Sequence, residues 1–142
     1  MFNSFRSLKN FSGSVGGAVR AIGRRSRNYK QASTIFEDST GPVMKITFLA
    51  GGSRGNNYVA NLLKITATKY RFRLYNNAGT RLNTITEEDA VAPPNVIENL
   101  VASINSNNTF KLYIHATFYK ETTEAISASV NIGDGQRLSG GR

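Results

Sequence analysis

The chain has 142 residues, with 18 Lys and Arg against 9 Asp and Glu, and it contains no cysteine. This length fits one domain plus a tail, because domains cluster at roughly 100–150 residues. The lack of cysteine excludes disulfides and thiolate chemistry. No apolar run approaches the ~20 residues that cross a bilayer, so we predict no membrane span.

Positive charge is concentrated at the N-terminus. Residues 1–30 hold seven Lys or Arg and no Asp or Glu, so they carry +7 of the net charge of +9. Several glycines in this segment oppose a stable helix. We predict that residues 1–33 form an extended, basic, Gly- and Arg-rich assembly arm that orders against a partner. A solvated tail and a mitochondrial transit peptide share this composition.

The arm offers two kinds of contact. Apolar side chains recur every three residues near its start and would dock on a protein surface. Its arginines would meet carboxylates or phosphates. The predicted partner-binding residues are Phe2, Phe5, Arg6, Leu8, Phe11, Arg20, Arg24, Arg25 and Arg27.

Residues 34–42 are predicted to be a short acidic linker. They contain the first carboxylates of the chain, Glu37 and Asp38, and they end at Gly41-Pro42, a pair that interrupts regular structure. The folded module is therefore predicted to span residues 43–142.

The module opens with a strand and a glycine-rich turn. Residues 43–49 alternate, with Met44, Ile46 and Phe48 on the apolar face. The following AGGSRGNN is rich in residues that tolerate positive φ, and it lacks the Gly-Lys-Ser/Thr of a phosphate loop. We predict a structural turn made by Gly51, Gly52, Gly55 and Asn56.

A β-hairpin is predicted next. Residues 58–68 and 70–75 are rich in β-branched and aromatic residues, and an NNAG turn precedes a returning strand at residues 81–86. The arginines of this hairpin fit two interpretations. They contact a polyanion, or they simply solvate an exposed strand. Alternation favours a shared face for Arg71, Arg73 and Arg81.

One helix is predicted at about residues 94–106, after Pro93-Pro94. Its apolar residues recur at i, i+3, i+4 and i+7, and they are Ile97, Leu100, Val101 and Ile104. Further strands are predicted at residues 109–119 and 125–132. The fold class is therefore predicted as α+β, with a mainly antiparallel sheet covered by one helix.

Few residues suit catalysis. His115 is the single histidine and has no evident partner. The acidic cluster at residues 87–89, predicted to lie in a loop, lacks the glycine-spaced ligands of a calcium site. No zinc pattern and no nucleophile elbow are present. We predict that the protein is not an enzyme, with no catalytic, cofactor-binding or metal site and no small-molecule substrate.

Four short segments together resemble a module of contractile-tail sheath proteins from bacteriophages and related injection machines. MKITFLAGGSRGNN resembles the strand and glycine turn that open this module, and FRLYNNAG resembles its hairpin. NVIENLVASINSNN resembles its helix, and RLSGG resembles its closing Leu-x-Gly-Gly. The resemblance covers residues 43–142.

The resemblance implies a non-enzymatic virion protein that is assembled in the host cytoplasm. Sheath proteins stack as hexameric rings around a tail tube, and their terminal arms add strands to neighbouring subunits. They are typically much longer than this chain, so a neck, collar or baseplate relative fits as well as a sheath subunit. The expected partners are further copies of the chain and other virion proteins.

A second function fits the same features. In a nucleic-acid-binding viral coat or packaging protein, the arginines of the arm would neutralise phosphates and the β-rich body would build the shell. Nucleic acid would then bind through the arm, and its affinity would fall steeply with ionic strength.

Overall fold

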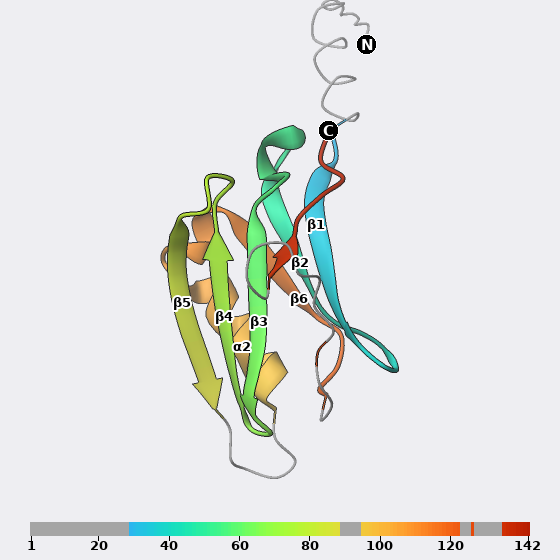
Figure 1. Cartoon of the computed structure of the whole chain (residues 1–142), viewed down its shortest axis with the longest axis vertical. Coiled ribbons are helices and arrows are strands. Elements are labelled where there is room, and N and C mark those ends of the chain that lie inside the picture. Colours follow the sequence, from blue (N-terminus) through green and yellow to red (C-terminus); the bar gives the residue numbers. More distant parts are fainter. Residues whose placement is uncertain (1–28, 89–94, 123–125, 127–134) are drawn as a thin grey trace, which may run out of the picture. The chain divides into compact units, whose positions relative to one another are not determined.

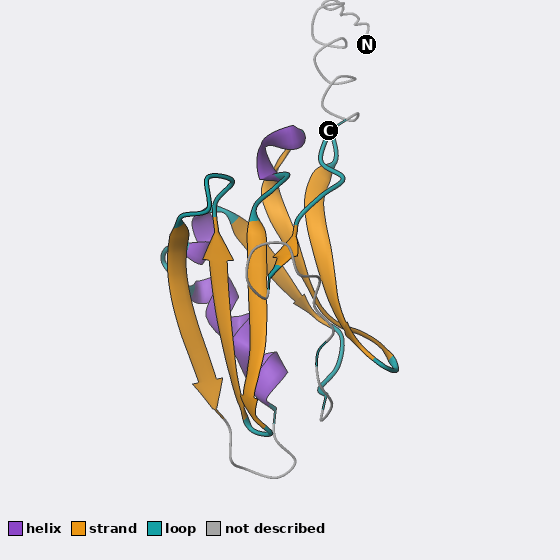
Figure 2. Ribbon diagram, in the orientation of Figure 1, coloured by secondary structure: helices purple, strands orange, loops and turns teal. Residues whose placement is uncertain are grey.

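The structure is a computed structural model that describes residues 29–88, 95–122, 126 and 135–142. Its main compact unit spans residues 31–141. Within this unit the described residues form a three-stranded sheet, a four-stranded sheet and one α-helix (Figures 1 and 2). The predicted α+β class, mainly antiparallel sheet with one helix, is confirmed.

The three-stranded sheet has the order β1–β2–β6 and is antiparallel throughout. Its strands are β1 (Gln31–Asp38), β2 (Gly41–Gly51) and β6 (Ile114–Phe118). Because successive side chains of a strand point to opposite faces, β2 places its alternate apolar residues in the core. These are the predicted Met44, Ile46 and Phe48.

Residues 34–42 do not form the linker that the sequence predicts. They belong to β1, to a two-residue turn and to the start of β2, and Phe36 is fully buried opposite Met44. The acidic residues that suggested a linker lie at the hairpin end of β1, where carboxylates do not interrupt the strand. β1 also begins at Gln31, inside the predicted arm of residues 1–33, and Ala32 is buried in the core.

The four-stranded sheet has the order β5–β4–β3–β7 and is also antiparallel. Its strands are β3 (Val59–Thr66), β4 (Lys69–Tyr75), β5 (Arg81–Glu88) and β7 (Gln136–Arg137). On β4, Tyr70, Phe72 and Leu74 are buried and define the inner face of this sheet. Arg71 and Arg73 lie on the opposite, outer face and are partly exposed.

Helix α2 (Val96–Ser106) packs on the inner face of the four-stranded sheet and along β6, as Figure 1 shows. Its predicted apolar stripe is buried. Glu121 supplies the cap, since its carboxylate accepts hydrogen bonds from the backbone N–H of Ile97 at 3.1 Å and of Glu98 at 2.8 Å. A carboxylate at this end satisfies free N–H groups and complements the helix dipole.

The C-terminal half of α2 protects the outer edge of β6. The Asn105 side chain donates to the backbone carbonyl of Ala116 at 2.9 Å and accepts from the N–H of the same residue at 2.7 Å. These are the backbone groups that a further strand would use. The helix therefore covers one sheet edge that would otherwise be open to pairing.

The C-terminal residues join the two sheets. The Gln136 side chain donates to Thr34 Oγ1 and to the carbonyl of Ile35, both at 2.9 Å. Ser139 and Ser33 exchange two backbone hydrogen bonds, at 2.9 and 3.1 Å. One core therefore lies between the sheets and α2. Its largest fully buried side chains are Tyr70, Phe36, Phe72, Phe110, Met44, Ile46, Leu74, Ile97, Leu100, Ile104 and Ile114.

The predicted strand at residues 109–119 is shorter in the structure. The Asn107 side chain accepts from the N–H groups of Thr109 and Phe110, at 2.9 and 3.0 Å, and so starts a 3₁₀ turn, η2 (Phe110–Leu112). Phe110 is buried but Leu112 is 68% exposed, so they do not share the face that strand alternation predicted. The predicted strand at residues 125–132 lies outside the described residues except for Ile126.

In the described ranges, no helix combines the length and apolar character that a membrane span requires.

An ion pair fastens the β1–β2 hairpin to the segment after β6. Lys120 Nζ donates to Asp38 Oδ1 at 2.8 Å and also contacts Thr40, and the Asp38 side chain is only 3% exposed. Hydrogen bonds from Lys120, Thr122 and Thr40 hold the pKa of Asp38 well below its usual value. The same segment is held by Tyr70, whose hydroxyl donates to the Thr122 carbonyl at 3.1 Å.

We expect the stability of the fold to depend on Asp38 in acid. Because folding lowers its pKa, this carboxylate contributes stability that is fully present above its unfolded pKa of about 3.9 and is lost as the pH falls further. Asp38→Asn should therefore lower the denaturation midpoint at pH 7 and differ less from the natural protein at pH 2. Urea denaturation between pH 7 and pH 2 measures this difference in midpoint. Glu88→Gln, which removes an exposed carboxylate of β5, is the matched control, and equal pH profiles for both variants would contradict the assignment.

Candidate functional site

The glycine-rich turn after β2 has the structural role that the sequence predicts, but its residues act differently. Gly51 ends β2 and pairs with Gln31. Gly52 has a φ of 89°, a conformation that favours glycine. The turn continues as η1 (Ser53–Gly55).

Gly55 is required for space and not for positive φ. It is buried, its backbone φ is not in the left-handed region, and a Cβ atom at this position would overlap the ring of Phe48. Besides Gly52, the residue of this turn with a positive φ is Asn57, at 76°. The close approach of Gly55 to Phe48 lets the turn fold down onto the end of the core.

The C-terminal segment docks on this turn. Leu138 donates its N–H to the Tyr58 carbonyl at 2.8 Å, and its own carbonyl accepts from the N–H of Asn57 at 3.1 Å. The Asn56 side chain holds both backbone groups of Gly141, donating to the carbonyl and accepting from the N–H, each at 2.9 Å. We call these contacts of residues 56–58 with residues 138–141 the terminal clasp.

The clasp needs a residue without a side chain at position 141. A Cβ atom on Gly141 would collide with the carbonyl oxygen of Gly52. Leu138 is fully buried in the core, so the clasp also anchors an apolar side chain. The glycines of both segments therefore serve one close backbone contact.

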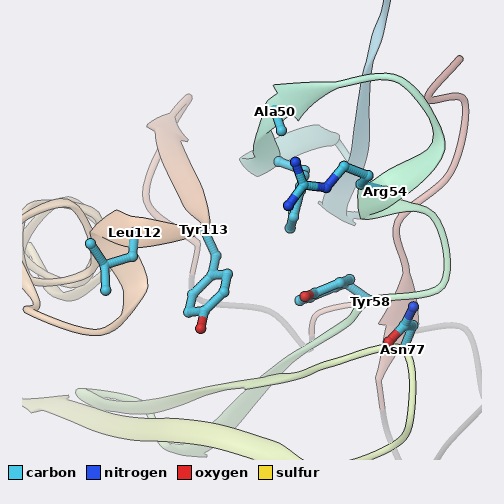
Figure 3. A pocket seen from close by; sticks show the side chains of 7 residues that line it. Ala50, Arg54, Tyr58, Asn77, Leu112 and Tyr113 are labelled. Carbon is cyan, nitrogen blue, oxygen red and sulfur yellow. The ribbon is translucent and has the colours of Figure 1, made fainter.

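A pocket of about 320 Å³ opens beside the glycine turn (Figure 3). Its wall is aromatic. The ring centroids of Phe48 and Tyr58 lie 4.7 Å apart, and those of Tyr58 and Tyr113 lie 6.3 Å apart. Arg54 reaches over Tyr58 from the turn (Figure 3). The full lining is Phe48, Ala50, Arg54, Tyr58, Asn77, Leu112 and Tyr113.

The chemistry of this pocket suits binding. Among the described residues, the seven that line it include no carboxylate, histidine, serine or threonine. Arg54 forms no ion pair with a described residue. An aromatic wall beside an unpaired guanidinium fits an apolar side chain that lies next to a carboxylate.

The predicted residues of the arm cannot be compared with the structure. Phe2, Phe5, Arg6, Leu8, Phe11, Arg20, Arg24, Arg25 and Arg27 all lie outside the described residues. Their predicted role in partner binding stays a prediction.

The remaining groups of chemical interest are dispersed. His115 is exposed on β6 opposite Thr47. Glu87 and Glu88 belong to β5 and not to a loop, and Glu87 accepts a hydrogen bond of 2.6 Å from Ser103 Oγ on α2. Across the described part of the chain, no group of three or more His, Cys, Asp or Glu is placed to hold a metal ion.

Comparison with known proteins found no match to any protein-family model, curated protein or solved structure.

Sequence reasoning found the turn but missed the clasp and the pocket. Both depend on residues far apart in the chain, since Asn56 and Gly141 are separated by 85 positions. No local pattern indicates that the two glycine segments meet. Tyr58 directly follows the turn and Tyr113 follows η2. Their rings lie near each other only in the folded chain.

We expect Gly55→Ala to destabilise the fold by about 1–3 kcal/mol, the usual effect of inserting a methyl group into a packed site. Urea denaturation measures the change. Ser53→Ala, in the same turn at an exposed position, should stay within about 0.5 kcal/mol. An unchanged midpoint for Gly55→Ala would show that Phe48 moves aside freely.

We also expect Asn56→Ala to release the C-terminal residues. Loss of two hydrogen bonds should lower the free energy of unfolding by about 1–3 kcal/mol and speed hydrogen exchange at the Gly141 amide. Asn77→Ala, which removes an amide from the pocket outside the clasp, is the control. Slow exchange at Gly141 in Asn56→Ala would mean that the clasp is held by other contacts.

Proposed function

We propose that this chain is a non-enzymatic structural protein of a virion, and within that class a component of a contractile tail that assembles into rings. The position is that of a sheath, neck, collar or baseplate subunit. The observation that carries the proposal is the terminal clasp, because it joins two of the four segments that resemble sheath modules.

The clasp gives these short motifs a common physical role. Glycine-rich segments occur in many proteins, and each segment alone is a weak indication. Here GGSRGNN and RLSGG are in direct contact, and Gly55 and Gly141 each occupy a place where a Cβ atom would collide. Two motifs that complete one close contact support the resemblance more strongly than two independent turns.

The body also presents surfaces suited to assembly. β5 is an edge strand, and within the described residues no strand pairs with its outer side. Exposed edges accept strands from neighbouring chains. The pocket beside the glycine turn, with the 68% exposed Leu112 at its margin, offers an anchoring point. A subunit that contacts several neighbours needs separate surfaces of this kind.

In this proposal the basic arm links neighbouring subunits. Its apolar residues contact further copies of the chain or other virion proteins, and the folded module sets the spacing between copies. Assembly takes place in the host cytoplasm, and the finished location is the virion. The protein needs no cofactor or small-molecule substrate for this role.

Removal of the arm tests the proposal. We expect a chain that lacks residues 1–28 to fold with an unchanged denaturation midpoint, because β1 begins at Gln31 and Ala32 lies in the core. A longer deletion through residue 33 would remove the strand residue that pairs with Ser139. The full chain should form rings or tubes in electron micrographs and sediment as large particles, whereas the truncated chain should sediment as a small species.

Two arm variants of full length separate the kinds of contact. One replaces Phe2, Phe5, Leu8 and Phe11 with serine, and the other replaces Arg20, Arg24, Arg25 and Arg27 with glutamine. Docking on neighbouring subunits predicts that the serine variant loses assembly. Closed shells that require the arginines and bound nucleic acid would instead establish the coat or packaging function and overturn the tail assignment.

A further inference from the structure

The outer face of the four-stranded sheet collects arginines from separate strands. Arg71 and Arg73 lie two residues apart on β4, and they alternate with the buried Tyr70, Phe72 and Leu74, so they lie on the face opposite the core. Arg71 is flanked by Leu63 and Thr86, and Arg73 by Asn61 and Thr84. Strand geometry places their Cα atoms about 6.8 Å apart.

Two more arginines extend this surface along the next cross-strand row. Arg81 on β5 lies opposite Tyr75, and Arg137 on β7 lies opposite Val59. Because Val59 and Tyr75 are themselves paired, this row runs across all four strands of the sheet. We call Arg71, Arg73, Arg81 and Arg137 the arginine face.

The arginine face is electrostatically unbalanced. None of its four guanidinium groups forms an ion pair with a described residue. The only carboxylate that the described strand register places on this face is Glu88, and it lies opposite Lys69 at the far end of the hairpin. With Lys69 included, the face has five cations and one carboxylate, a formal charge of +4.

Several polar atoms in these cross-strand rows also lack hydrogen-bond partners among the described residues. The Nε atoms of Arg71 and Arg73 are buried without a hydrogen bond, and so are Asn61 Oδ1 and Thr84 Oγ1. Asn61 is only 5% exposed. An unsatisfied buried polar group destabilises the fold, and native structures keep few of them. These atoms lie in the adjacent cross-strand rows of Arg71 and Arg73, so the polar groups of this face do not satisfy one another.

We propose that the arginine face binds single-stranded nucleic acid through its phosphates. Guanidinium groups match phosphate oxygens as paired donors. Single strands bind on sheets by stacking bases on aromatic rings and guanidinium planes. Tyr75 lies within the arginine face and offers such a ring. This surface belongs to the folded body and is separate from the arm.

The charge of the rest of the chain favours nucleic acid over an acidic protein. Residues 1–30 carry +7 with no carboxylate. A polymer with one negative charge per nucleotide can neutralise the arm and the arginine face together. The inference goes beyond the proposed structural function and does not depend on it, since a virion protein of any position can contact the genome.

The test measures how binding depends on salt. Full-length protein is titrated into a fluorescein-labelled oligothymidine at a series of NaCl concentrations, and fluorescence anisotropy reports the affinity. Each phosphate contact on a single strand adds about 0.7 to the slope of log affinity against log salt. We expect Arg71→Gln/Arg73→Gln to bind more weakly and to reduce this slope by roughly 1.4.

Two further variants make the result specific. Lys45→Gln/Lys111→Gln removes the same charge from β2 and η2, outside the arginine face, and should keep the natural slope. Arg71→Lys/Arg73→Lys keeps the charge and should keep most of the slope, because lysine also pairs with phosphate. Denaturation midpoints for all variants show that each is folded.

Three results would overturn the inference. The full chain could fail to bind oligothymidine at physiological salt. The glutamine variant could bind with the natural slope, which would leave all binding to the arm. The glutamine variant could also lose self-assembly while it binds oligothymidine normally, which would assign the face to an acidic protein partner. The arm deletion does not alter Arg71 or Arg73, so the tail assignment can fail while this inference stands.

Discussion

The terminal clasp is the contact on which the rest of the structure depends. The strands of the three-stranded sheet and of the four-stranded sheet alternate along the chain, and each sheet has an inner face that needs cover. Gln136 and Ser139 connect the C-terminal strand to β1, and Leu138 fills the core between them. The same C-terminal segment also contacts the glycine turn at the end of β2. One short segment therefore contacts both sheets.

Close contacts explain two glycines of the turn and of the C-terminal segment. At Gly55 a side chain would collide with the Phe48 ring, and at Gly141 it would collide with a backbone carbonyl. Only Gly52 is explained by its φ within the turn itself. Close packing of backbone on backbone and of backbone on an aromatic ring is the common cause. The pocket beside the turn follows from it, because the turn brings Arg54 and Tyr58 against Tyr113.

Local patterns predicted most of the elements and few of the contacts between them. The period of two along β2, β3 and β4 and the apolar stripe of α2 identify these elements, since each buries one face. The same reasoning failed for β1, because the acidic Glu37 and Asp38 indicated a linker although Phe36 is buried. It also failed for η2, where the Asn107 side chain accepts hydrogen bonds from backbone N–H groups and ends the extended pattern. The clasp and the pocket unite residues more than fifty positions apart. No spacing rule applies to such pairs, and they were not predicted.

Several described carboxylates make contacts within the fold, whereas the arginines of β4 lie on the outer face of the sheet. The one ion pair between described residues, Asp38 with Lys120, fastens a hairpin, and the Glu121 carboxylate caps α2. These carboxylates are used within the fold and cannot balance the arginines of β4. Glu87 accepts a hydrogen bond from Ser103, and Glu88 lies at the end of β5, so the described strands place no carboxylate at the centre of the outer face. Among the described residues, this face therefore carries more cations than carboxylates, because Asp38, Glu87 and Glu121 are used in contacts within the fold.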